Sequence, residues 1–201
     1  MKACICPSYG PPSNLVIEEL ADPIAAAGEV VVAVKACALN FFDTLIIQGK
    51  YQFKAEPPFS PSAEFAGIVE QVGDGVTEFA VGDRVMGYMV FGAARQKVVI
   101  TPDSLVKMPD DISFETAAGL TVTYGTTLHA FRDRAELKAG ETVAVLGASG
   151  GVGQAAVEIA SIMGAKVIAC ASSEEKLAFA KSLGADELVD YSKTSLKDTL
   201  K

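Results

Sequence analysis

The amino-acid sequence predicts an α/β protein in which a β-rich first domain is followed by the first βαβαβ half of a doubly wound parallel sheet. Three observations predict this order. Residues 2–35 contain short apolar runs separated by Pro, Gly, Asn and Asp, with no helical spacing between them. After residue 140, short apolar strands alternate with segments of helical spacing. A glycine-rich turn joins the first of those strands to the helix that follows it.

The first domain is built mainly from predicted strands. We expect these at Lys2–Cys6, Leu15–Leu20, Glu29–Lys35, Ala66–Val72, Arg84–Tyr88 and Gln96–Ile100. The repeated Val-Gly-Asp at 72–74 and 81–83 marks turns in which glycine can adopt a positive φ, which favours a compact, partly closed sheet. Between the strands, Asn40–Gln48 predicts one or two helical turns, followed by a Pro-rich loop at 57–61.

Helices and strands alternate in the remainder of the chain. Ser113 is the expected N-cap of a helix that enters Glu115–Leu120, and Val122–Phe131 continues with helical spacing. The later elements are a strand at Thr142–Leu146, a helix that ends at Gly164, a strand at Lys166–Ala171, a helix at Glu174–Leu183 closed by Gly184, and a strand at Glu187–Val189. A complete dinucleotide fold contains two such halves, so we expect this sequence to be a fragment.

The turn after Thr142–Leu146 is the most informative stretch. Four glycines follow the strand: Gly147, Gly150, Gly151 and Gly153. Such glycines let the backbone approach a pyrophosphate, and the N–H groups that begin the next helix attract its negative charge. The first position of the GxGxxG pattern is Ala148, so the match is imperfect. The sequence predicts a phosphate-binding turn, with a tight turn that binds no ligand as the alternative.

Composition excludes several other classes of protein. The net charge of −8 provides no basic surface for nucleic acid or an anionic membrane, and we expect no membrane-spanning segment. The four cysteines, Cys4, Cys6, Cys37 and Cys170, are too few and too scattered for a disulfide framework or a four-cysteine metal site. Cys4 and Cys6 are expected on one strand face as small buried hydrophobes. These features predict a protein of the reducing cytoplasm.

Five motifs together carry a family resemblance. They are Ala-Leu-Asn-Phe-Phe-Asp at 38–43, Glu-Phe-Ala-Gly at 64–67, the stretch at 72–85, Gly-Leu-Thr-Val-Thr-Tyr-Gly at 119–125, and the glycine turn at 147–153. With the domain order, they resemble the medium-chain dehydrogenase/reductase superfamily, specifically its zinc-free quinone oxidoreductase branch. The resemblance implies a GroES-like substrate domain over 1–124 and the first half of a Rossmann domain over 125–201. Ala148 suits this branch, which commonly has Ala-x-Gly-x-x-Gly at the turn.

The resemblance also implies that no metal takes part. Zinc-dependent relatives have Cys at the position matching Asn40 and His at the position matching Ala63, and they carry a cysteine-rich lobe that this sequence lacks. The residue count agrees, because His129 is the single histidine and catalytic zinc needs about three protein ligands. We expect His129 to be a helix-surface or packing residue, with a role as general acid as the alternative.

Four residues match the positions that surround substrate and nicotinamide in the family. Asn40, Asp43 and Tyr51 correspond to the substrate pocket, and Thr121 lies near the expected nicotinamide. Asn40 offers an amide donor, Tyr51 offers a phenol, and Asp43 could orient either of them. Each has a structural alternative: Asn40 and Asp43 could cap the helix at Phe41–Gln48, and Tyr51 could be a half-buried loop anchor.

The predicted cofactor is NADPH. An NAD site usually has an acidic residue at the end of its second strand, whereas this strand ends in Ser172 and Ser173. The positions that match 2′-phosphate ligands in NADPH-using relatives are Ser172, Ser173, Lys176 and Tyr191, and those that match the pyrophosphate turn are Ser149, Gly150, Gly151, Val152 and Gly153. The alternative is a capping box from Ser172 to Glu175, in which case an inward Glu174 or Glu175 would repel the phosphate.

These features predict an NADPH-dependent oxidoreductase that transfers hydride to a quinone or conjugated carbonyl bound between the two domains. The resemblance suggests a homodimer. Two alternatives stay open, a 2-enoyl thioester reductase and a protein that binds NADPH without turnover. A 201-residue piece could also be inactive alone, because half of the expected nucleotide sheet is missing.

Overall fold

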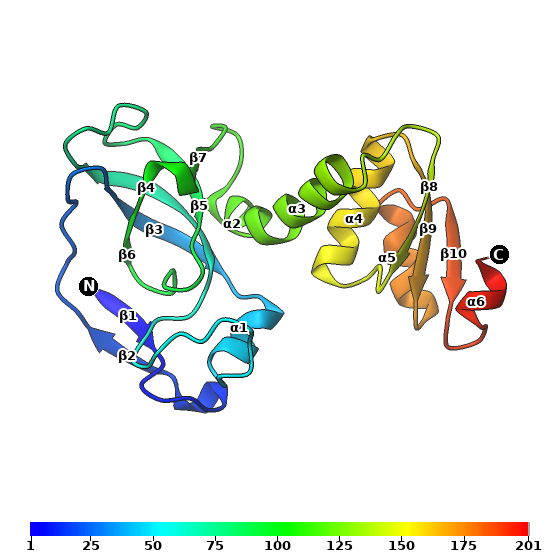
Figure 1. Cartoon of the computed structure of the whole chain (residues 1–201), viewed down its shortest axis with the longest axis horizontal. Helices are drawn as coiled ribbons and strands as arrows, with labels where there is room; N and C mark the ends of the chain where they lie inside the picture. The colour runs from blue at the N-terminus through cyan, green and yellow to red at the C-terminus, as the bar shows by residue number, and fades with distance from the viewer. Residues whose placement is uncertain (201) are drawn as a thin grey trace. The chain divides into compact units, whose positions relative to one another are not determined.

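The computed structural model describes residues 1–200 and separates into two compact units, Met1–Val122 and Thr123–Lys201 (Figure 1). The first unit therefore ends two residues before the boundary expected after residue 124. Across residues 1–200, no helix combines the length and the apolar character needed to cross a membrane.

The first unit is a β-domain, as predicted. A five-stranded antiparallel sheet has the order β6-β3-β4-β5-β7, and β1 and β2 form a separate antiparallel pair. The strands are β1 (Lys2–Ile5), β2 (Val16–Glu19), β3 (Val30–Ala38), β4 (Glu64–Val72), β5 (Arg84–Tyr88), β6 (Lys97–Ile100) and β7 (Leu105–Lys107). All six predicted strands are confirmed within a few residues. The edge strand β7 was not predicted, since its three residues are too few for a periodic pattern.

The core of the first unit lies along β3 and β4. Val30, Val32 and Phe65 are fully buried and pack in one cluster with residues from β5, β6 and β7. These β-branched and aromatic side chains suit a pleated strand that has neighbours on both sides. The two strands continue beyond the cluster, and their far ends, Ala38 and Glu64, are paired in register. This pairing brings Glu64 close to the chain segment that follows β3.

The helices of the first unit are short, and one expectation about them was wrong. They are α1 (Phe41–Ile46), α2 (Phe114–Ala118), the start of α3 (Leu120–Leu128), and the 3₁₀ turns η1 (Pro12–Asn14) and η2 (Pro102–Ser104). Ser113 caps α2 as expected, and its hydroxyl accepts the Thr116 N–H at 3.1 Å. The helix predicted to extend to Leu120 instead ends at Ala118, because Gly119 leaves helical geometry before α3 begins.

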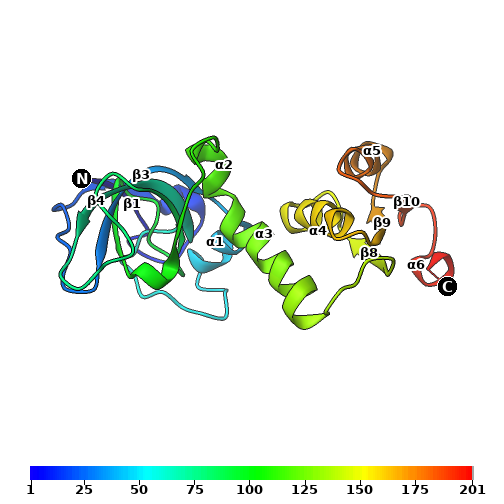
Figure 2. The same cartoon turned by 90° about the horizontal axis from the view of Figure 1, so that it is seen from above.

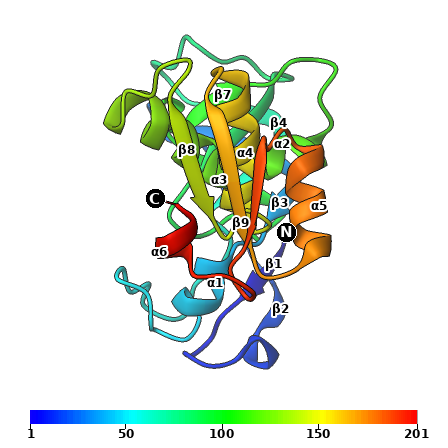
Figure 3. The ribbon, with the colours of Figure 1, turned by 90° about the vertical axis from the view of Figure 1, so that its right-hand side faces the viewer.

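The second unit confirms the βαβαβ prediction. β8 (Thr142–Leu146), β9 (Lys166–Ala171) and β10 (Glu187–Asp190) are parallel and lie in the order β10-β9-β8 (Figure 3). The connecting helices are α4 (Gly151–Ile162) and α5 (Glu174–Ser182), and α6 (Leu196–Thr199) follows β10. Figures 1 and 2 show α4 and α5 on the same face of the sheet. Helix α3 ends at Leu128 and continues as a π-helical turn, η3 (His129–Arg134), where α-helix was expected up to Phe131.

Small side chains form the core between these helices and the sheet. Val145, Val157 and Val167 pack with a set of buried alanines. On the opposite face of the sheet, Leu146 is 63% exposed. The two connecting helices, α4 and α5, therefore cover one face of this sheet, as in one half of a doubly wound fold.

A partly buried hydroxyl contact ties α3 to α4 within the second unit. The phenol of Tyr124 donates to a carboxylate oxygen of Glu158. This hydrogen bond, with burial and the negative charge of Glu158, raises the pKa of Tyr124 to about 12. The contact fixes the start of the unit against the helix that follows the glycine turn.

Two expectations about isolated residues have different outcomes. His129 lies on the surface, with Nδ1 2.8 Å from Asp133 Oδ2, which confirms the surface interpretation.

Cys4 and Cys6 were expected to share a buried face, and this was wrong for Cys4. Ala3 and Ile5 supply the buried face of β1, whereas Cys4 is only half-buried. Cys6 lies beyond the strand, where its N–H donates to the Phe59 carbonyl, and is buried there.

Candidate active site

Asn40 and Asp43 form a cap at the start of α1. Asn40 occupies the N-cap position, and its backbone N–H donates to Asp43 Oδ2 at 2.7 Å. The other carboxylate oxygen, Oδ1, accepts the buried Ser62 N–H at 3.0 Å. Burial raises the pKa of Asp43, although these two backbone donors act in the opposite direction. The capping alternative is therefore confirmed, and the Asn40 amide nitrogen takes no part in the cap.

Glu64 lies beside Asn40 and has no role in the sequence-based prediction. This residue is 1% exposed, and its carboxylate accepts two hydrogen bonds. Asn40 Nδ2 donates to Oε1 at 2.9 Å, and the Val122 N–H donates to Oε2 at 2.7 Å. The sequence does contain a signal, since Glu64 is an acidic residue in an otherwise apolar run, and such a residue needs hydrogen-bond partners if the run is buried.

Two tyrosines lie near Asp43. Tyr51 is half-buried with its ring centroid 5.5 Å from that of Phe42, so the loop-anchor alternative is confirmed. Tyr88 ends β5 and pairs in register with Glu64. Burial raises the pKa of Tyr88, and nearby Tyr51 and Asp43 add to the effect. Tyr88 is a second phenol in this region that the sequence did not reveal, because its neighbours are distant along the chain.

A small apolar cavity opens beside the Asn40–Asp43 cap. Its volume is about 100 Å³. The lining residues are Pro12, Leu15, Leu39, Asn40, Asp43, Thr44, Ile47 and Pro61. Apolar walls with a few polar groups are typical of a small-molecule site. The structure thus brings two of the three predicted catalytic residues to one cavity, and Tyr51 lies outside its lining.

Thr121 carries a buried hydroxyl at the start of α3. Its Oγ1 has no hydrogen-bond partner among residues 1–200. An unpaired buried hydroxyl costs about 1–3 kcal/mol, so its retention needs an explanation. The next residue, Val122, is the one whose N–H is bound by Glu64.

The glycine turn has the close backbone packing that its sequence suggests. Gly147 has a φ of +66°, and a Cβ atom at Gly153 would lie 2.2 Å from the Gly147 carbonyl oxygen. Gly150 is the N-cap of α4, so the N–H groups of the first turn, at 151–153, have no partner within the helix. Ala148 is fully buried in the core cluster, which explains why alanine is accepted where the general pattern has glycine.

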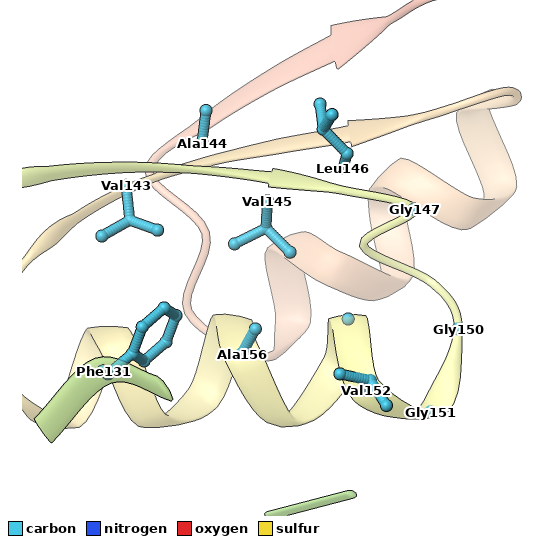
Figure 4. Close-up of a pocket in the computed structure, with 11 residues that line it drawn as sticks. Phe131, Val143, Ala144, Val145, Leu146, Gly147, Gly150, Gly151, Val152 and Ala156 are labelled. Atoms are coloured by element: carbon cyan, nitrogen blue, oxygen red, sulfur yellow. The ribbon is translucent and has the colours of Figure 1, made fainter. Parts of the chain in front are cut away.

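A larger cavity of about 500 Å³ lies between β8 and α4, next to this turn (Figure 4). Val143 and Val145 point from β8 toward the helix, and Ala144 and Leu146 point the opposite way. Phe131, Val152 and Ala156 add to the apolar lining. The lining also includes the glycines at 150, 151 and 153, so the cavity connects an apolar space to the first turn of α4.

The N-terminus of α5 holds the residues predicted for a 2′-phosphate. Ser173 is the N-cap and accepts the Lys176 N–H at 3.4 Å, and Lys176 Nζ donates to Ser172 Oγ at 3.1 Å. The capping box expected from Ser172 to Glu175 is wrong, since the helix starts one residue later. The N–H of Tyr191 donates to the Ala171 carbonyl at 3.1 Å, which brings it to the same strand end.

One cavity joins the glycine turn to this helix terminus. It measures about 260 Å³ and is lined by Ser149, Glu175, Lys176 and Phe179. Lys176 contributes a positive charge and Glu175 a negative one. The neighbouring Glu174 is paired with Lys193 at 2.7 Å. The structure therefore brings Ser149, Ser172 and Lys176 together, and Glu175 adds an opposing charge to the same lining.

Two dehydrogenase family models match this chain. Residues 26–110 match the family model of the alcohol dehydrogenase GroES-like domain, and residues 151–201 match that of the zinc-binding dehydrogenase. Quinone oxidoreductase-like protein 2 of Rattus norvegicus is 39% identical over 201 residues, which is the whole of this chain and 57% of the relative. The chain belongs to the medium-chain dehydrogenase/reductase superfamily, in its quinone oxidoreductase branch.

Two solved structures of this branch are similar over most of the chain. The Escherichia coli quinone oxidoreductase complexed with NADPH has a TM-score of 0.93 and 32% identity, covering 100% of this chain and 62% of the other. The Thermus thermophilus quinone oxidoreductase, also solved with NADPH, has a TM-score of 0.85 and 37% identity, covering 96% and 61%. The GroES-like and half-Rossmann prediction of the fold is confirmed. The chain spans a little under two thirds of the relatives that it matches.

Proposed function

We propose that this chain carries the substrate-binding and cofactor-binding residues of an NADPH-dependent oxidoreductase that reduces a quinone or a conjugated carbonyl. The proposal assigns the substrate role to residues 1–124 and the nucleotide role to residues 125–201. The observation that carries it is the cavity that Ser149 and Lys176 share, with Lys176 Nζ on Ser172 Oγ at 3.1 Å. An ammonium group at a helix N-terminus suits a phosphate dianion.

Other features of the described residues fit the cofactor. The first-turn N–H groups at 151–153 suit a pyrophosphate, and the 2.2 Å approach at Gly153 leaves no room for a side chain there. The unpaired hydroxyl of Thr121 is a buried polar group that a bound nicotinamide carboxamide could satisfy. Ser173 follows β9, and Tyr191 follows β10 with its N–H on the carbonyl of the last β9 residue, so both belong to the proposed 2′-phosphate site.

NADPH, when bound, supplies a hydride equivalent. Reduction of a quinone carbonyl by hydride leaves an oxyanion, which needs hydrogen-bond donors and one proton to give the hydroquinone. Asn40 offers the Nδ2 proton that does not bind Glu64, and Tyr51 offers a phenol proton. Asp43 holds the start of α1, and so the backbone of Asn40, in place. The small cavity that Asn40 and Asp43 line is mostly apolar, which favours an apolar acceptor over water.

We propose that the reaction proceeds without zinc. Asn40 and Ala63 stand where the zinc-dependent relatives have a cysteine and a histidine, so these positions provide neither sulfur nor imidazole. The Asn40 amide donates instead to Glu64. Residues 151–201 contain one cysteine, the buried Cys170, and no histidine. Within residues 1–200 no three His, Cys, Asp or Glu side chains are grouped to hold a metal ion. A cytoplasmic homodimer is proposed from the family and from the four free thiols.

Oxidation of NADPH by a panel of acceptors tests this function. We expect turnover with quinones or enones, at a rate that a strong chelator leaves unchanged. Activity on enoyl thioesters but not on quinones would favour the 2-enoyl thioester reductase. Tight NADPH binding without turnover on any acceptor would contradict the enzyme and favour a binding protein.

The Lys176→Met variant tests the choice of cofactor. Because a charge-assisted hydrogen bond contributes about 1.5–3 kcal/mol, the Kd for NADPH is expected to rise about 10- to 100-fold. The Kd for NADH, which lacks the 2′-phosphate, should change less than about twofold. Lys181→Met is the matched control, since Lys181 lies near the other end of α5 with Nζ on the Asp186 carbonyl. Equal losses for both nucleotides, measured by titration, would refute a 2′-phosphate contact.

A further inference from the structure

Glu64 joins two segments that the proposed reaction uses, and its own role is unassigned. Asn40 precedes α1, and Val122 lies in the first turn of α3. They are 24 and 58 residues from Glu64 along the chain, yet each donates one hydrogen bond to it, at 2.9 and 2.7 Å. Glu64 is 1% exposed. Burying a carboxylate costs free energy, so a glutamate in such a position usually has a structural or functional role through its hydrogen-bond partners.

The contact to Val122 completes the start of a helix. The first N–H groups of α3 have no partner within the helix, and that of Val122 is one of them. A carboxylate at this point accepts the Val122 N–H, and its negative charge interacts favourably with the positive end of the helix dipole. Glu64 thereby fixes the backbone beside Thr121, whose hydroxyl is buried and unpaired among residues 1–200.

The contact to Asn40 decides which way its amide faces. A carboxylate only accepts hydrogen bonds. Glu64 Oε2 accepts the Val122 N–H, and a backbone N–H can only donate. At Oε1, an acceptor requires the NH₂ group of Asn40 rather than its oxygen. The Asn40 oxygen therefore points away from Glu64, and one N–H stays available for a ligand. The Asn40 side chain lines the apolar cavity beside α1.

We propose that Glu64 is a positioning residue that holds the Asn40 amide in one orientation and couples it to the start of α3 beside Thr121. Its carboxylate sets the polarity that Asn40 presents to the carbonyl acceptor, and it does not itself touch substrate. This rests on the proposed reduction of a carbonyl compound, since the polarity of Asn40 matters only if Asn40 contacts the acceptor.

Replacing Glu64 with glutamine reverses that polarity without changing the shape of the side chain. The Val122 N–H still requires an acceptor, so the new amide gives it an oxygen and turns its own NH₂ group toward Asn40. Asn40 must then rotate its amide by half a turn to present oxygen to that donor. Glu70→Gln is the matched control, because Glu70 lies on the same strand but binds Lys97 at the surface.

Two measurements on the full chain test the proposal separately from the reaction. In nitrogen-15 NMR spectra, E64Q should shift the Asn40 side-chain NH₂ resonances upfield and leave the hydrogen-bonded Val122 amide in place, with no such shift in E70Q. In turnover assays, E64Q should lower kcat about tenfold or more with an unchanged Kd for NADPH, which is roughly 1.4 kcal/mol of lost transition-state binding.

Each outcome has a definite meaning. An unmoved Asn40 resonance in folded E64Q overturns the positioning role, whatever the activity. A moved resonance with unchanged kcat overturns its importance for the reaction. A moved resonance in a protein whose unsubstituted form turns over no acceptor supports the positioning and refutes the oxidoreductase.

Discussion

Alanine at position 153 is expected to destabilise the second unit and abolish NADPH binding. The added Cβ would lie 2.2 Å from the Gly147 oxygen and 2.9 Å from Ala148 Cα, both backbone atoms that no rotamer change can move. Overpacking against backbone at a turn of this kind costs about 3 kcal/mol or more. We expect a lower urea midpoint by circular dichroism, which suits a protein without tryptophan, and no saturable NADPH binding.

Two other glycines separate folding from binding. A Cβ at Gly150 would find only the Gly147 oxygen, at 3.5 Å, and the φ and ψ of −78° and 162° suit alanine. Gly150→Ala should therefore fold normally and bind NADPH more weakly.

Gly125 lies inside α3 with nothing within 4 Å of a Cβ, so Gly125→Ala should raise stability by about 0.5–1 kcal/mol. Unchanged stability and NADPH affinity in Gly153→Ala would contradict the close packing of the turn.

Local patterns account for the parts of the fold that could be predicted. The strands and the βαβαβ order follow from short apolar runs, and the end of α4 follows from Gly164, which has a φ of +78°. Errors occurred where local chemistry was ambiguous. Ser172 and Ser173 are both suitable N-caps, and the helix selects the second. Gly119 is compatible with a helix on pattern alone, but it separates α2 from α3.

The candidate site was predictable only as far as its contacts are local. The cap formed by Asn40 and Asp43 spans three residues and has a sequence signature. The pairing of Glu64 with Asn40 and Val122 depends on how β4 returns beside β3, and no periodicity records it. Tyr88 likewise joins the site through its register with Glu64 across two strands. The sequence therefore identifies the residues of the turn and the cap, whereas the long-range hydrogen bonds and strand pairings around them are seen only in the folded structure.

Removing the Asp43 carboxylate should have the largest effect in the first unit. Asp43→Ala leaves the N–H groups of Asn40 and Ser62 without their acceptor, and the Ser62 group is buried. A buried N–H left without an acceptor and the loss of a helix cap together lower the free energy of unfolding by roughly 2–4 kcal/mol. We expect this loss in the free energy of unfolding from urea titrations, together with loss of the proposed quinone reduction as the Asn40 backbone is released. A variant with stability within about 0.5 kcal/mol of the unsubstituted protein would refute the cap.

The pH dependence of Asp43→Asn provides a second, signed test of the same carboxyl. Burial raises the pKa of Asp43 above its usual 3.8, so the folded protein binds this proton more tightly than the unfolded chain. The stability that this adds is fully present below pH 3.8 and is lost as pH rises through the raised pKa. The asparagine of the variant does not titrate. The stability of the unsubstituted protein relative to Asp43→Asn should therefore fall with rising pH across that interval and stay constant above it. A difference that grows with pH would mean that the two backbone donors outweigh burial, and that Asp43 is stabilised as a carboxylate.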